Sequence, residues 1–140
     1  MDKFKEIRPI VLGIVKRGNK VLVGEGYDKV KKEVFYRSLG GGIEFLEKSE
    51  DALKREFKEE LHIDVKVGNF LGVAENIFTY NGKNGHEIIF FYEVEIKDED
   101  YKEKYHVIDD NCDNDAVWVD VEKFRNKELK IYPEEVFKYI

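Results

Sequence analysis

The sequence has few residues that could cross-link the chain or insert it into a membrane. Only one of its 140 residues is cysteine, which excludes an internal disulfide framework. Apolar runs near the N-terminus are short and interrupted by Lys, Arg and Gly. They fall well short of the roughly 20 apolar residues of a membrane span and do not resemble a signal peptide. We therefore expect a soluble, cytoplasmic protein.

The sequence also has little clustered positive charge. The formal net charge is −6, which argues against a function driven by attraction to nucleic acid backbones. The acidity is concentrated in residues 97–114, where seven acids stand against three lysines. We interpret this run as a solvated loop or insertion. Small polyanions could still bind locally, above all through a metal ion.

Apolar patterning predicts a single α/β domain over residues 1–140. Residues 7–15 are apolar on both faces, which suits a buried central strand, and residues 17–19 supply a turn for a first hairpin. Residues 49–61 consist of strong helix formers, with Ser49 as the expected N-cap.

The second half of the chain is rich in strand signals. Two Asn-Gly pairs between residues 65–80 and 86–96 predict another hairpin. Residues 116–121 suggest a further strand, and residues 133–140 a final helix opened by its proline. The order of strands and helices predicts an α/β sandwich with a mixed sheet.

Three glutamates share one edge of the predicted helix 49–61. Glu56, Glu59 and Glu60 stand at i, i+3 and i+4, within an arc of roughly 100°. Each pair of like charges at this spacing destabilises a helix by roughly 0.2 to 0.5 kcal/mol unless a cation relieves the repulsion. Carboxylate oxygens suit Mg²⁺ or Mn²⁺. The alternative interpretation is a solvated charged face.

A run of three glycines precedes the helix. Without a Cβ, Gly40, Gly41 and Gly42 allow the backbone to approach a metal ion or a phosphate closely. No Gly-Lys-Ser/Thr follows, so the run is not a P-loop. Glycines alone are weak evidence, and their weight comes from their spacing to the glutamates.

That spacing resembles the signature of the Nudix hydrolases, G-x5-E-x7-R-E-U-x-E-E-x-G-U, in which U is a bulky apolar residue. The signature is matched by Gly41, Glu47, the segment REFKEEL at 55–61 and Ile63, and the match covers 23 of the 140 residues. We call residues 41–63 the box and the helix predicted within them the box helix. The resemblance implies a Nudix-type α/β/α sandwich with a central mixed β-sheet. It also implies a metal-dependent pyrophosphohydrolase that cleaves a nucleoside diphosphate linked to another group X.

The resemblance further implies roles for individual residues. Glu47 is expected to pair with Arg55, and Mg²⁺ or Mn²⁺ is the expected cofactor. The metal ligands it implies are the carbonyl of Gly40 and the carboxylates of Glu44, Glu56, Glu59 and Glu60.

A carboxylate must also accept a proton from the attacking water. Glu59 or Glu60 is our first choice for this role, and Glu87, at the start of a predicted strand, is the second. An ordinary exposed glutamate at a strand end is the competing interpretation of Glu87. The expected catalytic group is thus Glu59, Glu60, Arg55 and Glu87.

Further residues are candidates for substrate binding. Arg37 could contact a phosphate or a base, and Phe78 could stack on a base. Each could instead be an ordinary strand residue. His86 could contact phosphate or cap the hairpin. The expected substrate-binding group is Arg37, Gly41, Gly42, Phe78 and His86.

Two positions depart from the signature. His62 replaces the glycine that ends the helix, and we expect it to adopt a left-handed cap at modest cost. Leu46 stands where many members have glycine. A left-handed leucine costs about 1 to 2 kcal/mol, so we expect the loop over residues 45–48 to take another path.

Two classes of function remain open. The first is hydrolysis of a free nucleotide, a nucleotide sugar, ADP-ribose or a dinucleoside polyphosphate, in a monomer or a homodimer. The second is a non-catalytic Nudix-like module that senses a nucleotide. A degenerate signature would favour the second, whereas the segment at 55–60 is complete.

Overall fold

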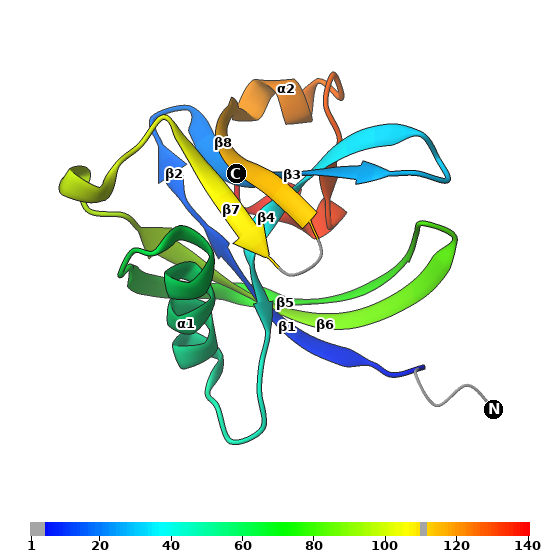
Figure 1. Ribbon diagram of the computed structural model, residues 1–140, viewed down its shortest axis with the longest axis horizontal. Coiled ribbons are helices and arrows are strands. Elements are labelled where there is room, and N and C mark those ends of the chain that lie inside the picture. The colour runs from blue at the N-terminus through cyan, green and yellow to red at the C-terminus, as the bar shows by residue number, and fades with distance from the viewer. Residues whose placement is uncertain (1–4, 110–111) are drawn as a thin grey trace.

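The computed structural model describes residues 5–109 and 112–140 and is a curved mixed sheet flanked by helices (Figure 1). Its strands follow the order β5-β6-β1-β4-β3-β8-β7, with β2 pairing to β3 and β9 to β4. The strands are β1 (Arg8–Ile14), β2 (Lys16–Arg17), β3 (Lys20–Asp28), β4 (Glu33–Gly42), β5 (Lys66–Tyr80), β6 (Lys83–Glu95), β7 (Lys104–Asp109), β8 (Cys112–Asp120) and β9 (Ile131–Tyr132). The helices are α1 (Ser49–Leu61) and α2 (Val121–Arg125), with the 3₁₀ turns η1 (Asp98–Asp100) and η2 (Glu134–Lys138).

Strand β1 lies inside the sheet, as its apolar sequence predicts. It runs parallel to β6 and antiparallel to β4, so the sheet is mixed. Val11 packs on one face, and Ile10 and Leu12 pack on the other. Both faces of the strand are therefore buried, which explains why its apolar residues do not alternate with polar ones.

Strand β4 joins two halves of the sheet. Its first part, residues 33–38, pairs with β3, and its last part, residues 39–42, pairs with β1. We call β5, β6 and β1 the first half-sheet and β3, β8 and β7 the second half-sheet. A cavity between the two half-sheets is therefore lined by side chains of both of them.

The two helices cover opposite faces of the sheet (Figure 1). Leu53, Phe57 and Leu61 of α1 pack in one cluster, where they are almost fully buried. Val121 and Phe124 of α2 belong to the cluster on the other face. This arrangement confirms the predicted sandwich, and the apolar stripe of α1 leaves the glutamate edge of that helix outside the core.

Helix α1 begins differently from our prediction and ends as predicted. Its N-cap is Lys48, which makes no side-chain capping bond, so the predicted cap at Ser49 is wrong. The Ser49 hydroxyl instead lies 2.7 Å from the hydroxyl of Tyr92. At the other end, His62 has a φ of 59° and donates its backbone N–H to the carbonyl of Lys58. Histidine thus provides the left-handed cap for which glycine is usual.

The loop before α1 also contains a left-handed residue. Leu46 has a φ of 68°, so our expectation of another path for residues 45–48 is wrong. The Glu44 N–H donates to the Glu47 carboxylate, and the Glu47 N–H donates to the Glu44 carbonyl. This tight turn fixes the backbone on both sides of Leu46, which explains why the strained conformation is kept.

The hairpin β5–β6 confirms the turn signal in the sequence. Asn81 and Gly82, with φ of 51° and 78°, form a two-residue connection that matches the twist of the strands. The second Asn-Gly pair, Asn84-Gly85, lies inside β6, opposite Thr79 and Phe78.

The acidic run and the C-terminus differ from our predictions. Residues 104–109 of the run form strand β7, because they pair with β8, so a simple loop is wrong for them. Residues 110 and 111 lie outside the described residues. At the C-terminus, η2 is a 3₁₀ turn that follows Pro133, not an α-helix. No helix within residues 5–109 and 112–140 has the length and apolar character needed to cross a membrane.

Candidate active site

Arg55 is the centre of a network that joins α1 to the preceding loop. Its Nε and Nη2 donate to the two carboxylate oxygens of Glu47 at 2.9 and 3.0 Å, and Nη2 also donates to the carbonyl of Gly42 at 2.9 Å. Its Nη1 donates to Glu56 at 3.0 Å and approaches Glu59 at 3.3 Å. One guanidinium therefore fixes both the loop and two of the helix carboxylates.

The charges of this network stabilise one another. The hydrogen bonds from Arg55 lower the pKa of Glu47, with a further contribution from the backbone N–H of Glu44. In return, the hydrogen bond to Glu47, followed by the effect of Glu56, raises the pKa of Arg55. Arg55 therefore relieves part of the like-charge repulsion that the sequence predicts on this helix edge.

Gly41 allows Glu56 to lie directly against the backbone. A Cβ added at Gly41 would come within 2.4 Å of the Glu56 carboxyl carbon and would displace that carboxylate. Gly40 has a φ of 149°, and a Cβ there would come within 2.0 Å of the carbonyl oxygen of Val11. Close packing against the backbone of β1 thus requires glycine at position 40, whereas Gly41 leaves room for the Glu56 carboxylate beside β4.

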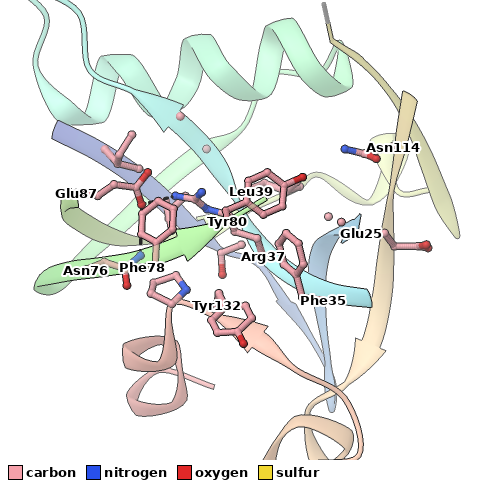
Figure 2. Close-up of a pocket in the computed structure, with 18 of the residues that line it drawn as sticks. Glu25, Phe35, Arg37, Leu39, Asn76, Phe78, Tyr80, Glu87, Asn114 and Tyr132 are labelled. Carbon is pink, nitrogen blue, oxygen red and sulfur yellow. Dashed lines mark hydrogen bonds and ion pairs between the residues drawn. The ribbon is translucent and has the colours of Figure 1, made fainter. Parts of the chain in front are cut away.

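A cavity of about 420 Å³ opens between the two half-sheets (Figure 2). Glu60 of α1 and the glycines Gly40 and Gly41 lie along it, together with residues of β3, β5, β6 and the segment after β9. The hydroxyl of Ser38, also on its wall, is buried and has no hydrogen-bond partner among the described residues. Such a volume is in the range of small-molecule sites, and a ligand or a water could satisfy that hydroxyl.

An ion pair with a buried carboxylate joins β4 to the first half-sheet (Figure 2). Arg37 of β4 donates from Nη2 to Oε1 of Glu87 of β6 at 2.9 Å, and the amide of Asn76 of β5 lies 3.4 Å from the same oxygen. Glu87 is only 2% exposed, so the exposed strand-end glutamate that we considered for it is wrong. Its partners come from both sides of the cavity.

Aromatic rings line the part of the cavity beyond this ion pair (Figure 2). Phe35 contacts Tyr80 and Tyr132 edge to face, with ring centroids 5.6 and 5.7 Å apart. Phe78 of β5 lies on the cavity wall near Glu87. Apolar rings beside a few fixed polar groups are typical of a site for a flat, polar ligand.

The hairpin tips of the two half-sheets are also hydrogen-bonded to each other. The buried carboxylate of Asp28 accepts the backbone N–H groups of Val30, Lys31 and Asn81. The Asn81 side chain accepts the N–H of Lys29 in return. We call these contacts the hairpin clasp. The backbone bond from Lys31, with those from Asn81 and Val30, lowers the pKa of Asp28 against the opposing effect of burial.

The structure sorts the predicted site residues into two groups that meet at α1. The residues along the cavity are Arg37, Gly40, Gly41, Glu60, Phe78 and Glu87. The residues around the Arg55 guanidinium are Gly42, Glu44, Glu56 and Glu59, with Glu44 Oε1 at 3.7 Å. The contact between Gly41 and Glu56 joins the groups.

His86 belongs to neither group. It lies within β6 opposite Ile77, and it does not cap the turn, which is formed by Asn81 and Gly82. It is not among the described residues along the cavity.

Three further residues along the cavity were not predicted from the sequence. Arg8, Asn76 and Tyr132 come from β1, β5 and β9. Asn76 follows Glu75 in β5, and a polar pair in a predicted strand is only a weak signal of a functional position. Arg8 and Tyr132 had no such signal, because only the pairing of distant strands brings them to the cavity.

The donor set on α1 fits a hard divalent cation, although the side chains do not enclose one. Glu56, Glu59 and Glu60 offer only carboxylate oxygens, which Mg²⁺ and Mn²⁺ prefer. Within residues 5–109 and 112–140, no three His, Cys, Asp or Glu side chains converge as a ready-made metal site. Glu59 is 58% exposed at its side chain, so its carboxylate is accessible to a ligand from solvent.

Comparisons with known proteins identify the family and the fold of the chain. The model of the NUDIX domain family matches residues 6–140. A search of curated proteins found no match. Among solved structures, a MutT NUDIX hydrolase from Burkholderia pseudomallei is 20% identical with a TM-score of 0.64, over 84% of this chain and 86% of that one.

Two other solved structures have the same fold. A NUDIX hydrolase from Nitrosomonas europaea is 20% identical with a TM-score of 0.63, over 95% of this chain and 85% of that one. A NUDIX-family hydrolase from Clostridium perfringens is 20% identical with a TM-score of 0.57, over 87% of each chain. The family match extends from before β1 to the last residue and includes the whole box. The chain therefore belongs to the NUDIX family and is a Nudix hydrolase.

Proposed function

We propose that this hydrolase cleaves a nucleoside diphosphate linked to another group, in a reaction that depends on Mg²⁺ or Mn²⁺. The observation that carries the proposal is that Glu60 of the box helix lies along the same cavity as Arg37 and the aromatic rings. A nucleoside bound among the rings would extend its diphosphate toward Gly40, Gly41 and α1. Chemistry and recognition would then take place in one continuous site.

The residues proposed to hold the metal are the carboxylates of Glu56, Glu59, Glu60 and Glu44, with the Gly40 carbonyl. When bound, a divalent ion at this position neutralises phosphate charge and makes a coordinated water more nucleophilic. Glu56 is held against the Gly41 backbone by Arg55 and by close packing. Part of the ligand set is therefore preorganised before a cation arrives.

The protein's own groups would perform the remaining tasks. Arg55 holds the loop and Glu56 in place, while the exposed Glu59, or Glu60, would accept a proton from the attacking water. The cation Arg8, on the cavity wall beside the glycines, would attract the diphosphate. Arg37 and Phe78 would contact the nucleoside.

The leaving group is the part of the substrate that the cavity constrains least. Free nucleotides, nucleotide sugars, ADP-ribose and dinucleoside polyphosphates all present a nucleoside diphosphate. We propose a free nucleotide as the preferred class. The first experiment measures formation of a shorter nucleotide from these four classes, with release of phosphate or pyrophosphate measured as well for free nucleotides, in Mg²⁺, in Mn²⁺ and in EDTA.

Metal-dependent cleavage of one class would support the proposal and identify the substrate. Nucleotide binding without turnover of any class would overturn it in favour of a non-catalytic sensing module. Activity that persists in EDTA would overturn the metal dependence alone.

The substitution Glu59→Gln tests the catalytic assignment. It preserves the shape of an exposed side chain and removes its charge, so we expect turnover to fall by about 10²-fold or more while the fold is kept. Glu50→Gln is the matched control, because Glu50 lies nine positions earlier, on the opposite side of the helix by about 180°. Unchanged turnover in Glu59→Gln would contradict the role of Glu59. Both variants should unfold at the same urea concentration as the wild type, within error.

A further inference from the structure

Glu87 is a buried carboxylate whose charge is balanced from across the cavity. It is 2% exposed, and burial of an unpaired carboxylate would be strongly unfavourable. Its ion pair with Arg37 at 2.9 Å supplies the opposite charge, and Asn76 contacts the same oxygen. Asn76 lies on β5, and Arg37 lies in the part of β4 that pairs with β3, so the carboxylate connects β6, β5 and β4.

Arg37 is held by only part of its guanidinium. Its Nη2 donates to Glu87, whereas no hydrogen bond joins its Nε or Nη1 to the described residues. The side chain lies along the cavity and is 36% exposed. In Figure 2 the guanidinium lies between Glu87 and Leu39, within the space that the aromatic rings surround. Its remaining donors are therefore available to a molecule in the cavity.

From this geometry we infer that Glu87 is a positioning residue, which fixes Arg37 for nucleotide recognition, and not the general base. The inference rests on the proposed function for the identity of the ligand. The Arg37 guanidinium, held through Nη2, presents its Nε and Nη1 donors to acceptor atoms of the nucleotide. Glu87 thus acts on binding through Arg37 and does not exchange a proton with the attacking water.

The contacts of Glu87 disfavour a role as proton acceptor. A general base must reach the attacking water directly or through one further water. One oxygen of Glu87 is already held by Arg37 and Asn76, and the side chain is almost wholly enclosed. Glu59, on the helix edge, is 58% exposed at its side chain and is therefore accessible to water.

The two roles predict opposite kinetic effects of Glu87→Gln and Glu87→Ala. If Glu87 positions Arg37, Glu87→Ala raises KM for the substrate by about 10-fold or more and changes kcat by less than about 3-fold. Glu87→Gln, which keeps the size and one acceptor oxygen, has a smaller effect on KM. A general base would instead lose about 10²- to 10⁴-fold in kcat in both variants with KM unchanged, which would overturn the inference.

A double-mutant cycle separates positioning from a general loss of structure. Arg37→Lys keeps the charge and loses the planar fork, so it should raise KM about as much as Glu87→Ala. The KM of the double variant should be no higher than that of either single variant, because both substitutions disrupt the same Arg37–Glu87 interaction. Independent, additive losses would overturn the inference. Asn84→Ala, which removes an exposed acceptor in the same hairpin, is the matched control for folding.

A binding experiment without turnover keeps this inference separate from the proposed reaction. AMP, GMP, CMP and UMP are titrated calorimetrically into the wild type and Glu87→Ala in EDTA. We expect at least one mononucleotide to bind the wild type, and Glu87→Ala to bind it about 10-fold or more weakly. Equal affinities, or no binding of any mononucleotide by the wild type, would overturn the inference. Neither result depends on whether the enzyme hydrolyses anything.

Discussion

A single strained residue lies in the loop that connects the glycine run to the box helix. Leu46 has a φ of 68°, where leucine is unfavourable by about 1 to 2 kcal/mol, and its side chain is 92% exposed. No packing compensates for the strain. The neighbouring bonds between Glu44 and Glu47, together with the pairing of Glu47 to Arg55, hold the loop closed around it. The strain is therefore retained for the position of the carboxylate network.

Replacing Leu46 with glycine should stabilise the protein. Glycine adopts this φ freely, although it adds about 0.4 to 1 kcal/mol of unfolded-state entropy, so we expect a net gain of about 1 kcal/mol. Urea unfolding measures the change. Phe45→Gly is the matched control, because Phe45 is equally exposed and is not among the described residues with positive φ. The control should lose stability slightly. Equal effects of the two substitutions would show that Leu46 stores no strain.

At the scale of elements, the hairpin clasp connects the turn between β3 and β4 to the tip of β5–β6. Asp28 accepts three backbone N–H groups, two from its own turn and one from Asn81. Further contacts run between the same tips: Lys31 Nζ donates to the carbonyl of Thr79, and the Tyr80 hydroxyl donates to the carbonyl of Tyr27. The far end of the cavity is thus closed by contacts of one half-sheet with the other.

The substitution Asp28→Asn should loosen both hairpin tips and reduce stability near neutral pH. Since the folded state lowers the pKa of Asp28, the carboxylate stabilises the fold above its ordinary pKa of about 3.9. That contribution is lost as the pH falls through the lower, folded-state value. The difference between wild type and variant in urea unfolding should therefore be constant from pH 7 to about pH 5. It should narrow below about pH 4.

Hydrogen exchange locates the same effect. Amides of residues 29–32 and 80–82 should exchange faster in Asp28→Asn than in the wild type, while amides of α1 should not change. Asn84→Ala is the control, since its side chain accepts from Thr79 within one hairpin only. A stability difference that is independent of pH would contradict an ionised Asp28 as the origin of the clasp.

The same elements show what a sequence can and cannot reveal. The glutamate edge of α1, the left-handed cap at His62 and the hairpin at Asn81 depend on neighbours within a few residues, and all three were predicted correctly. The capping role of Ser49 was wrong because its hydroxyl pairs with Tyr92, 43 positions later. The burial of Glu87 likewise depends on a partner 50 positions away, Arg37 of β4, which local patterns do not contain. Strand β7 pairs with the next strand in the chain, and it was missed because its acidic sequence favoured a solvated loop.

At the scale of the molecule, the cavity lies between two half-sheets that β4 connects. The hairpin clasp crosses from one half-sheet to the other, and the Arg37–Glu87 ion pair joins the first half-sheet to the part of β4 that pairs with β3. A nucleotide in the cavity would add contacts of the same kind, whereas a ligand bound only at the exposed edge of α1 would touch the box and its loop. Binding should therefore reveal which of these two places the substrate occupies.

This difference predicts the effect of a non-hydrolysable substrate analogue. With Mg²⁺, an α,β-methylene nucleoside triphosphate at 100 times its Kd should stabilise the fold by about 2.7 kcal/mol. Hydrogen exchange should slow in β5–β6 and in β3–β4 as well as in α1, because the ligand contacts both half-sheets. Glu87→Ala should lose most of the protection in β3–β4 at the same analogue concentration. Protection limited to α1 and residues 40–48 would place the whole ligand outside the cavity, and it would contradict the proposed nucleoside site.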